Sequence, residues 1–325
     1  MPRLLGQDEH AMRHAASVVA DGGVVVFPTE TVYGIGGLTC SSEAIDSIYR
    51  IKGRPSRNPL IAHVLDATMA RMVVDSWDRL CDELAERFWP GPLTLVLPRR
   101  SSVPSRSTAG LDTIAVRSPG HPVARELLEL VGEPISAPSA NRSGSITATG
   151  VEAVMQEFSD YDDLCILDGG ASVIGIESTV LDLCSDPPRI LRPGSIGPSQ
   201  LQEVIPSILT ERIESQDASP GTSLAHYQPR TPVLLLERTQ VMEQLRRSGQ
   251  SHVVLSHGPM ELDADAALLE MPVDDAAYAA RLYSALREAD QLDHDRIIIE
   301  RPTGQGEFWN AILDRLQRAS AMADD

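Results

Sequence analysis

Lysine occurs once in this chain. Of the 28 basic side chains, 27 are arginine and one is Lys52. Arginine replaces lysine easily as a surface charge, but not where a compact ammonium group is needed. Arg54 follows after a single glycine, and in an extended loop the two side chains can converge on one anion. We therefore take Lys52 and Arg54 as a candidate anion-binding pair; the alternative is a basic surface turn.

A second pair of polar residues, Ser139 and Asn141, has the same spacing in a loop of small residues. Hydroxyl, amide and exposed backbone N–H groups of this kind can surround phosphate oxygens. The alternative is an ordinary turn in which these side chains bond to their own backbone.

Four polar segments each lie at the end of a predicted strand, where ligand sites of α/β proteins gather. They are Pro28–Gly36, Lys52–Pro59, Ser136–Gly144, and Gly175–Thr179 with Arg192–Ser195 close behind it.

Two further residues lie at predicted strand ends. Arg117 could bind a ligand carboxylate with two hydrogen bonds, or could pair with a neighbouring acid. His63 lies in an apolar context, where a lone histidine is more often structural than catalytic. The usual nucleotide-binding glycine motifs are absent, as are HExxH and paired-cysteine metal motifs, so no protein metal site is expected.

Hydrophobic periodicity predicts alternating helices and strands up to residue 207, as in an α/β domain on a mixed sheet. Residues 208–231 contain few apolar side chains between 209 and 230 and are interpreted as a linker. Residues 232–325 follow a β-α-β-α-β-α pattern, which predicts a smaller Rossmann-like parallel unit. The predicted elements are helices at 8–21, 42–51, 80–88, 122–131, 151–158, 199–204, 240–247, 274–290 and 308–319, and strands at 24–28, 60–64, 93–97, 113–116, 135–137, 164–168, 179–183, 189–192, 233–236, 253–256 and 296–300.

Composition limits the function classes. The net charge of −18 argues against a protein that grips a nucleic-acid backbone, so no stable nucleic-acid binding is expected. The longest apolar runs are far too short to span a membrane. The four cysteines have no CxxC spacing and are typical of a reducing compartment, which predicts a cytoplasmic protein.

Six segments together resemble the YrdC-like family of threonylcarbamoyl-AMP synthases. They are Gly23–Gly36 (GVVVFPTETVYGIG), Tyr49–Leu60 (YRIKGRPSRNPL), Trp89–Leu97 (WPGPLTLVL), Ile135–Gly144 (ISAPSANRSG), Gly175–Leu183 (GIESTVLDL) and Ile190–Ile196 (ILRPGSI). The family's KxR and SxN signatures correspond here to Lys52, Arg54, Ser139 and Asn141, which the resemblance implies are catalytic.

The second part of the chain is similar to the family's long form, which adds a Rossmann-like C-terminal domain behind a linker. The similarity lies in Ser219–Gly221, His226–Pro229 and Asp314–Leu316, whereas Thr222–Ala225 stands where the family has basic and aromatic residues.

This resemblance implies a YrdC-like mixed twisted sheet and two sets of ligand contacts. ATP is expected to contact Arg54, Asn58, Thr113, Ser139, Thr147, Arg192 and Tyr227. L-threonine is expected to contact Thr31, His63, Arg117, Ala137 and Ser178, with Arg117 binding its carboxylate.

The implied reaction joins L-threonine, bicarbonate and ATP, with Mg²⁺ on the phosphates, into threonylcarbamoyl-AMP. The product would pass to a downstream tRNA threonylcarbamoyl transferase complex. Residues Ser219–Pro229 are the expected lid over the site. Three alternatives remain: a non-catalytic RNA-binding module, a carbamoyl transferase of the hydrogenase-maturation type, and a C-terminal docking module that is compatible with catalysis.

Overall fold

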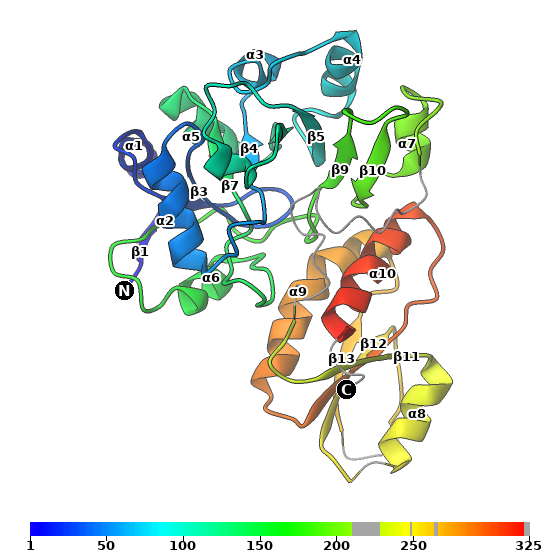
Figure 1. Ribbon diagram of the computed structural model, residues 1–325. Coiled ribbons are helices and arrows are strands. Elements are labelled where there is room, and N and C mark those ends of the chain that lie inside the picture. The colour runs from blue at the N-terminus through cyan, green and yellow to red at the C-terminus, as the bar shows by residue number, and fades with distance from the viewer. Residues whose placement is uncertain (210–227, 248, 263–265, 322–325) are drawn as a thin grey trace.

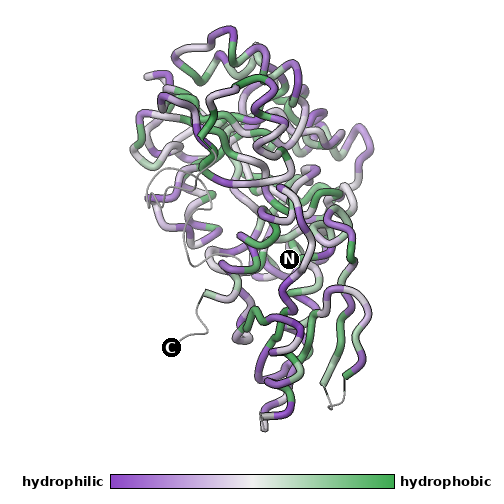
Figure 2. Tube along the Cα trace, turned by 90° about the vertical axis from the view of Figure 1, so that its right-hand side faces the viewer, coloured by the Kyte–Doolittle hydropathy of each residue, from purple (hydrophilic) through white to green (hydrophobic). Residues whose placement is uncertain are grey.

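The computed structural model describes residues 1–209, 228–247, 249–262 and 266–321, which form two α/β bodies, each around its own sheet (Figure 1). Hydrophobic residues run through the interior of both bodies, and hydrophilic residues dominate the outer turns (Figure 2). Among the helices of these residues, none is long and apolar enough to cross a membrane.

The N-terminal body is built on a mixed sheet in the order β1-β8-β2-β3-β7-β4-β6-β5-β9-β10. Its strands are β1 (Arg3–Leu5), β2 (Val25–Phe27), β3 (Gly34–Leu38), β4 (Ile61–His63), β5 (Leu93–Pro98), β6 (Thr113–Arg117), β7 (Ile135–Ala137), β8 (Cys165–Leu167), β9 (Thr179–Asp182) and β10 (Arg189–Arg192).

Helices cover both faces of this sheet. They are α1 (Glu9–Ala20), α2 (Ser42–Lys52), α3 (Ala67–Ala70), α4 (Arg79–Phe88), the 3₁₀ helix Ser105–Thr108, α5 (Pro122–Val131), α6 (Val151–Glu157) and α7 (Pro198–Gln202). The α1 and α5 helices pack in one hydrophobic cluster and α2 and α6 in another, and β2 and β8 contribute to both. Strands β2 and β8 are therefore covered on both sides, as their uninterrupted apolar sequences require.

The C-terminal body is a parallel four-stranded sheet in the order β11-β14-β12-β13. Its elements are β11 (Val233–Leu236), α8 (Arg238–Arg247), β12 (His252–His257), β13 (Ala267–Met271), α9 (Asp275–Gln291), β14 (Arg296–Glu300) and α10 (Glu307–Ser320). Helix α8 packs on one face, and α9 with α10 packs on the other.

Three strands depart from the predicted pattern: β1, β3 and β13. The three-strand prediction for the C-terminal unit is wrong, because β13 adds a fourth strand beside β12, and the described residues between the two strands form no helix. The β13 sequence, Ala-Leu-Leu-Glu-Met, contains no β-branched residue and carries no strand signal of its own. Strand β3 was not predicted because three of its five residues are glycine, which has a low preference for strands. Its pairing with neighbouring strands fixes the conformation instead.

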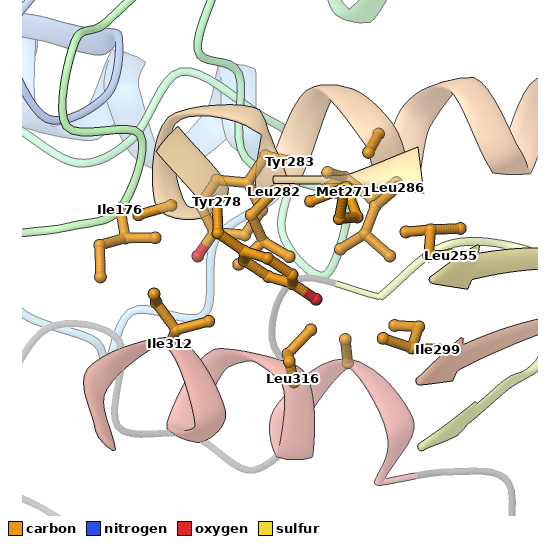
Figure 3. Close-up of a cluster of buried hydrophobic side chains, with 14 of the residues drawn as sticks. Ile176, Leu255, Met271, Tyr278, Leu282, Tyr283, Leu286, Ile299, Ile312 and Leu316 are labelled. Atoms are coloured by element: carbon orange, nitrogen blue, oxygen red, sulfur yellow. The ribbon is translucent and has the colours of Figure 1, made fainter. Parts of the chain in front are cut away.

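The two bodies share one hydrophobic cluster. Ile176 of the N-terminal body packs with residues of α9 and α10, among them Tyr283, Ile312 and Leu316. Figure 3 shows Ile176 at the end of the cluster, beside α9 and above α10. The C-terminal body thus packs against the loop that precedes β9.

Candidate functional site

One pocket brings together residues from all four polar segments. Its lining consists of Thr29, Thr31, Val32, Tyr33, Gly34, Arg54, Ile61, His63, Arg117, Ala137, Pro138, Ser139, Glu177, Ser178 and Arg192. Eight of these are residues that the sequence assigned to ATP or threonine. The sheet creates this convergence, since the segments are distant in sequence.

Strand register places four of the lining residues beside one another in two pairs. On the parallel strands β4 and β6, His63 is the partner of Arg117, and on the antiparallel pair of β4 and β7, Ile61 is the partner of Ala137. Ala137 is the last residue of β7, is buried and lines the pocket.

Arg117 has contacts on each side of its guanidinium. It donates to the carbonyl oxygen of Gly91 (3.2 Å) and to Oγ1 of Thr31 (2.8 Å), and it forms a 2.7 Å ion pair with Glu30. Burial raises the pKa of Glu30, but Arg117 outweighs it and holds the pKa below its usual value. Arg117 therefore pairs with a neighbouring acid, which was the alternative to ligand binding. The same side chain also lines the pocket.

His63 is buried and uncharged at neutral pH. Burial, together with the nearby charge of Arg117, lowers the pKa of His63 to about 3. Its Nδ1 donates to the carbonyl oxygen of Ile61 (3.2 Å), and its ring lies edge-on to Phe27. His63 thus lines the pocket as a neutral imidazole ring.

Lys52 does not lie in an extended loop with Arg54. It is the last residue of α2, and Gly53 ends that helix in the left-handed conformation (φ 59°). Lys52 Nζ donates to the carbonyl oxygens of Ser139 (2.5 Å) and Asn141. Lys52 therefore binds the backbone of the Ser139–Asn141 loop. It is not among the residues that line the pocket.

The Ser139–Asn141 loop has its own internal bonds. Ser139 Oγ donates to Oδ1 of Asn141 (2.6 Å), and Asn141 Nδ2 donates to the carbonyl oxygen of Ser145 (2.8 Å). The turn alternative for this pair is thus realised, while Ser139 also lines the pocket. The loop is preformed, which lowers the entropic cost of ordering it around a ligand.

Arg54 and Arg192 bring two buried guanidinium groups to the pocket. Arg54 donates to the carbonyl oxygens of Asn58 (3.1 Å) and Pro59 (3.0 Å), so Asn58 takes part through its backbone. Arg192 donates from Nε and Nη2 to the carbonyl oxygen of Ser178 (3.1 and 3.0 Å). Buried guanidinium groups in a concave site favour anionic ligands.

Of the described residues predicted to contact ATP, three do not line the pocket: Asn58, Thr113 and Thr147. Thr113 opens β6 opposite Pro98, and Thr147 donates to Oε1 of Glu177 (3.2 Å), behind the lining. Asn141, which was predicted to be catalytic, does not line the pocket and accepts a hydrogen bond from Ser139, which does. Tyr227 and most of the Ser219–Pro229 lid lie outside the described residues, so these predictions stay as they are.

Sequence reasoning missed four polar or charged residues that shape the site. Thr29, Glu30 and Tyr33 lie in the first polar segment, and Glu177 lies in the fourth. Glu177 is the one acidic residue of Gly175–Thr179, and it directly precedes Ser178, which was predicted to contact threonine. That position could have identified Glu177 as a residue near the site.

The part of the chain that the structure describes holds no group of three or more His, Cys, Asp or Glu side chains able to bind a metal ion. The two carboxylates at the pocket are each engaged by arginine, Glu30 by Arg117 and Glu177 by Arg315.

Comparison with known proteins gives matches over nearly the whole chain. A family model described as Telomere recombination (Sua5, YciO and YrdC) matches residues 17–194, and one described as Threonylcarbamoyl-AMP synthase, C-terminal domain, matches residues 196–321. A protein of Pyrococcus abyssi named threonylcarbamoyl-AMP synthase is 37% identical over 96% of this chain and 95% of its own. A Bacillus subtilis protein of the same name is 38% identical over 97% and 94%.

The fold agrees with these sequence matches. The crystal structure of P. abyssi Sua5 complexed with L-threonine is 35% identical, with a TM-score of 0.91 over 99% of this chain and 98% of that one. One family therefore accounts for both bodies of the chain. The protein belongs to the threonylcarbamoyl-AMP synthase family, in the form that carries a C-terminal domain.

Proposed function

We propose that the protein condenses L-threonine, bicarbonate and ATP into threonylcarbamoyl-AMP and pyrophosphate. The observation that carries this is the single pocket in which Arg54, Arg192 and Ser139 lie with Arg117, His63 and Ser178. The named relatives, and the threonine complex of the P. abyssi protein, give the substrates that such a pocket would take.

The pocket divides by chemistry into two regions. Arg117, with Thr31 and Ser178, would bind the carboxylate and hydroxyl of threonine beside the neutral His63 ring. Arg54, Arg192 and Ser139 would bind the phosphates, because guanidinium and hydroxyl donors neutralise and orient phosphate oxygens. Lys52 would act by fixing the loop that carries Ser139.

The reaction needs positioning more than a nucleophilic side chain. The threonine amine captures bicarbonate or carbon dioxide to give a carbamate, and water or a proton is released. A carbamate oxygen then attacks the α-phosphate in line, and pyrophosphate leaves with the electrons of the broken P–O bond. Such transfers depend mainly on orientation and charge neutralisation, which buried arginines provide.

The nucleotide would arrive as its magnesium complex. Because both pocket carboxylates are already bound by arginine, the metal would be held by phosphate oxygens and water. We further propose that the protein acts in the cytoplasm and passes its product to a tRNA threonylcarbamoyl transferase complex. The reactive carbamoyl adenylate is a suitable donor for such a group transfer.

The test is pyrophosphate release from ATP with magnesium, with and without bicarbonate, and with each amino acid in turn. We expect release to require both threonine and bicarbonate. Lys52→Ala should lower it at least tenfold, since an ammonium bonded to two carbonyls is lost. Arg79→Ala, at an exposed helix position, is the matched control and should leave it unchanged. Release without any amino acid would indicate a plain ATP pyrophosphatase and overturn the proposal.

A further inference from the structure

Five residues, Ile174–Ser178, connect the pocket wall to the C-terminal body. The N–H of Ile174 donates to the carbonyl oxygen of Glu30 (2.8 Å). Gly175 lies against α9 so closely that a Cβ there would come within 2.3 Å of the carbonyl oxygen of Ala279. Ile176 packs into the C-terminal core (Figure 3). The segment therefore touches both bodies along its length.

The carboxylate of Glu177 is held mainly by the C-terminal body. It accepts bonds from Nε of Arg315 in α10 (3.0 Å) and from the hydroxyl of Tyr283 in α9 (3.0 Å), and a third from Thr147 (3.2 Å). Arg315 and Tyr283 are each 1% exposed and Glu177 is 7% exposed. Asp314 accepts a further bond from Arg315 (3.0 Å) and so fixes its guanidinium.

Glu177 also lies in the electrostatic reach of Arg192, and both residues line the pocket. Burial raises the pKa of Glu177, but the charges of Arg315 and then Arg192 outweigh it, and the pKa stays below its usual value. Glu177 is therefore a buried anion with two cations near it. Arg315 binds it, while Arg192 donates to the carbonyl oxygen of Ser178.

We propose that Arg315 and Tyr283 of the C-terminal domain are positioning residues that hold the Glu177 carboxylate away from Arg192, so that Glu177 does not compete with the phosphates of the nucleotide for the Arg192 guanidinium. Without Arg315, the buried carboxylate turns toward Arg192, because a buried unpaired charge is costly. The C-terminal domain thus completes the nucleotide site without entering it. This inference rests on the proposed assignment of Arg192 to ATP.

The experiment measures KM for ATP and kcat in threonine-dependent pyrophosphate release, using the full-length chain. Arg315→Gln should raise KM for ATP roughly tenfold, the change that corresponds to the loss of one charged contact to an anion. Tyr283→Phe removes only the hydroxyl donor and should give a smaller rise. In the double variant Glu177→Gln with Arg315→Gln, the competing carboxylate of Glu177 is gone, and KM should return toward the wild-type value.

Arg318→Gln is the matched control. Arg318 lies on the same helix, is 5% exposed and donates to Asp314 from Nε (3.0 Å) and Nη2 (3.2 Å), but it does not line the pocket. Its loss should lower Tm as Arg315→Gln does, while KM for ATP stays near the wild-type value. A merely structural role of Arg315 would give the two variants the same kinetics.

A pH series adds a second readout. In Arg315→Gln, the burial of Glu177 is no longer offset by its main cation, so its pKa rises and the group protonates as pH falls. The ratio of variant to wild-type KM should therefore decrease as pH falls. The inference is overturned if Arg315→Gln leaves KM for ATP unchanged, if the double variant is no better than the single, or if Arg318→Gln behaves alike.

Arg192→Gln in the otherwise wild-type chain separates the two proposals. If it leaves KM for ATP unchanged, the assignment of Arg192 to the nucleotide is wrong and the positioning role falls with it. If it raises KM while Arg315→Gln does not, the nucleotide site stands as proposed and only the role of the C-terminal domain is wrong.

Discussion

Burial decides what each polar residue of the pocket can contribute. The side chains of His63 and Arg117 in the pocket, and of Lys52 outside its lining, are titratable or charged, and each residue is at most 5% exposed. Arg117 forms an ion pair with Glu30, whereas burial and the charge of Arg117 lower the pKa of His63 and hold it in its neutral form. The pocket therefore has a paired cation and an uncharged ring as register partners on β6 and β4.

His63 makes a prediction for stability against pH. Its pKa in the folded chain is about 3, against roughly 6.5 when unfolded, so the unfolded state binds more protons between these values. The stability that neutral His63 contributes is complete above pH 6.5 and is lost as pH falls toward 3. At pH 5 the loss amounts to about 2 kcal/mol relative to pH 7.5.

Urea unfolding at pH 7.5 and pH 5 checks this prediction. The free energy of unfolding of the wild type should fall by about 2 kcal/mol more than that of His63→Asn, whose side chain does not titrate. Other carboxylates, such as Glu30, titrate in both proteins and cancel in the comparison. Equal losses in the two proteins would show that His63 does not become charged on unfolding in this range.

At the scale of elements, the contact between the loop before β9 and helix α9 is unusually close. Gly175 has φ +80°, and a Cβ there would lie 2.3 Å from the carbonyl oxygen of Ala279 and 2.4 Å from Cα of Ala280. Both atoms belong to helix backbone, which cannot turn aside as a flexible side chain can.

Gly175→Ala should therefore lower the free energy of unfolding by roughly 3 kcal/mol or more, from strained backbone and overpacking together. Gly132→Ala is the control: its φ is +72°, but nothing lies within 4 Å of the added Cβ. It carries only the backbone cost, roughly 1 kcal/mol. Equal destabilisation of the two variants, measured from urea midpoints, would contradict the close contact.

Local signals predicted most elements and the convergence of the four polar segments. Helix α2 is an example, with the Ser41 hydroxyl accepting from the N–H of Ala44 at its start and Gly53 at its end. Lysine chemistry singled out Lys52, but its partners are carbonyls 87 and 89 residues away, which no local pattern encodes. The partners that hold Glu177 most closely, Arg315 and Tyr283, likewise lie in the other body, so no local pattern encodes them.

At the scale of the whole molecule, the shared core predicts cooperative unfolding. Ile176 and the Glu177–Arg315 ion pair are buried contacts between the two bodies. Neither body could form these contacts by itself. We expect the two bodies to unfold in a single transition, because separation would remove Arg315 and Tyr283 from the Glu177 carboxylate and expose the shared hydrophobic cluster.

The three tryptophans allow this to be measured, since Trp77 and Trp89 lie in the N-terminal body and Trp309 lies in the C-terminal one. Trp309→Phe leaves fluorescence that reports the first body, and the double variant Trp77→Phe with Trp89→Phe reports the second. In each variant the fluorescence midpoint in urea should coincide with that of far-UV circular dichroism. Two separate midpoints would show that the bodies unfold independently.

The segment Ile174–Ser178 also bears on how such proteins can be recombined. It lies within the range of the first family model, residues 17–194, yet its side chains are packed and charge-matched by helices of the second, residues 196–321. A chimera joined at the sequence boundary would give Glu177 a foreign neighbour in place of Arg315. Exchange of C-terminal domains between homologues should therefore succeed when these five residues are grafted together with the incoming domain.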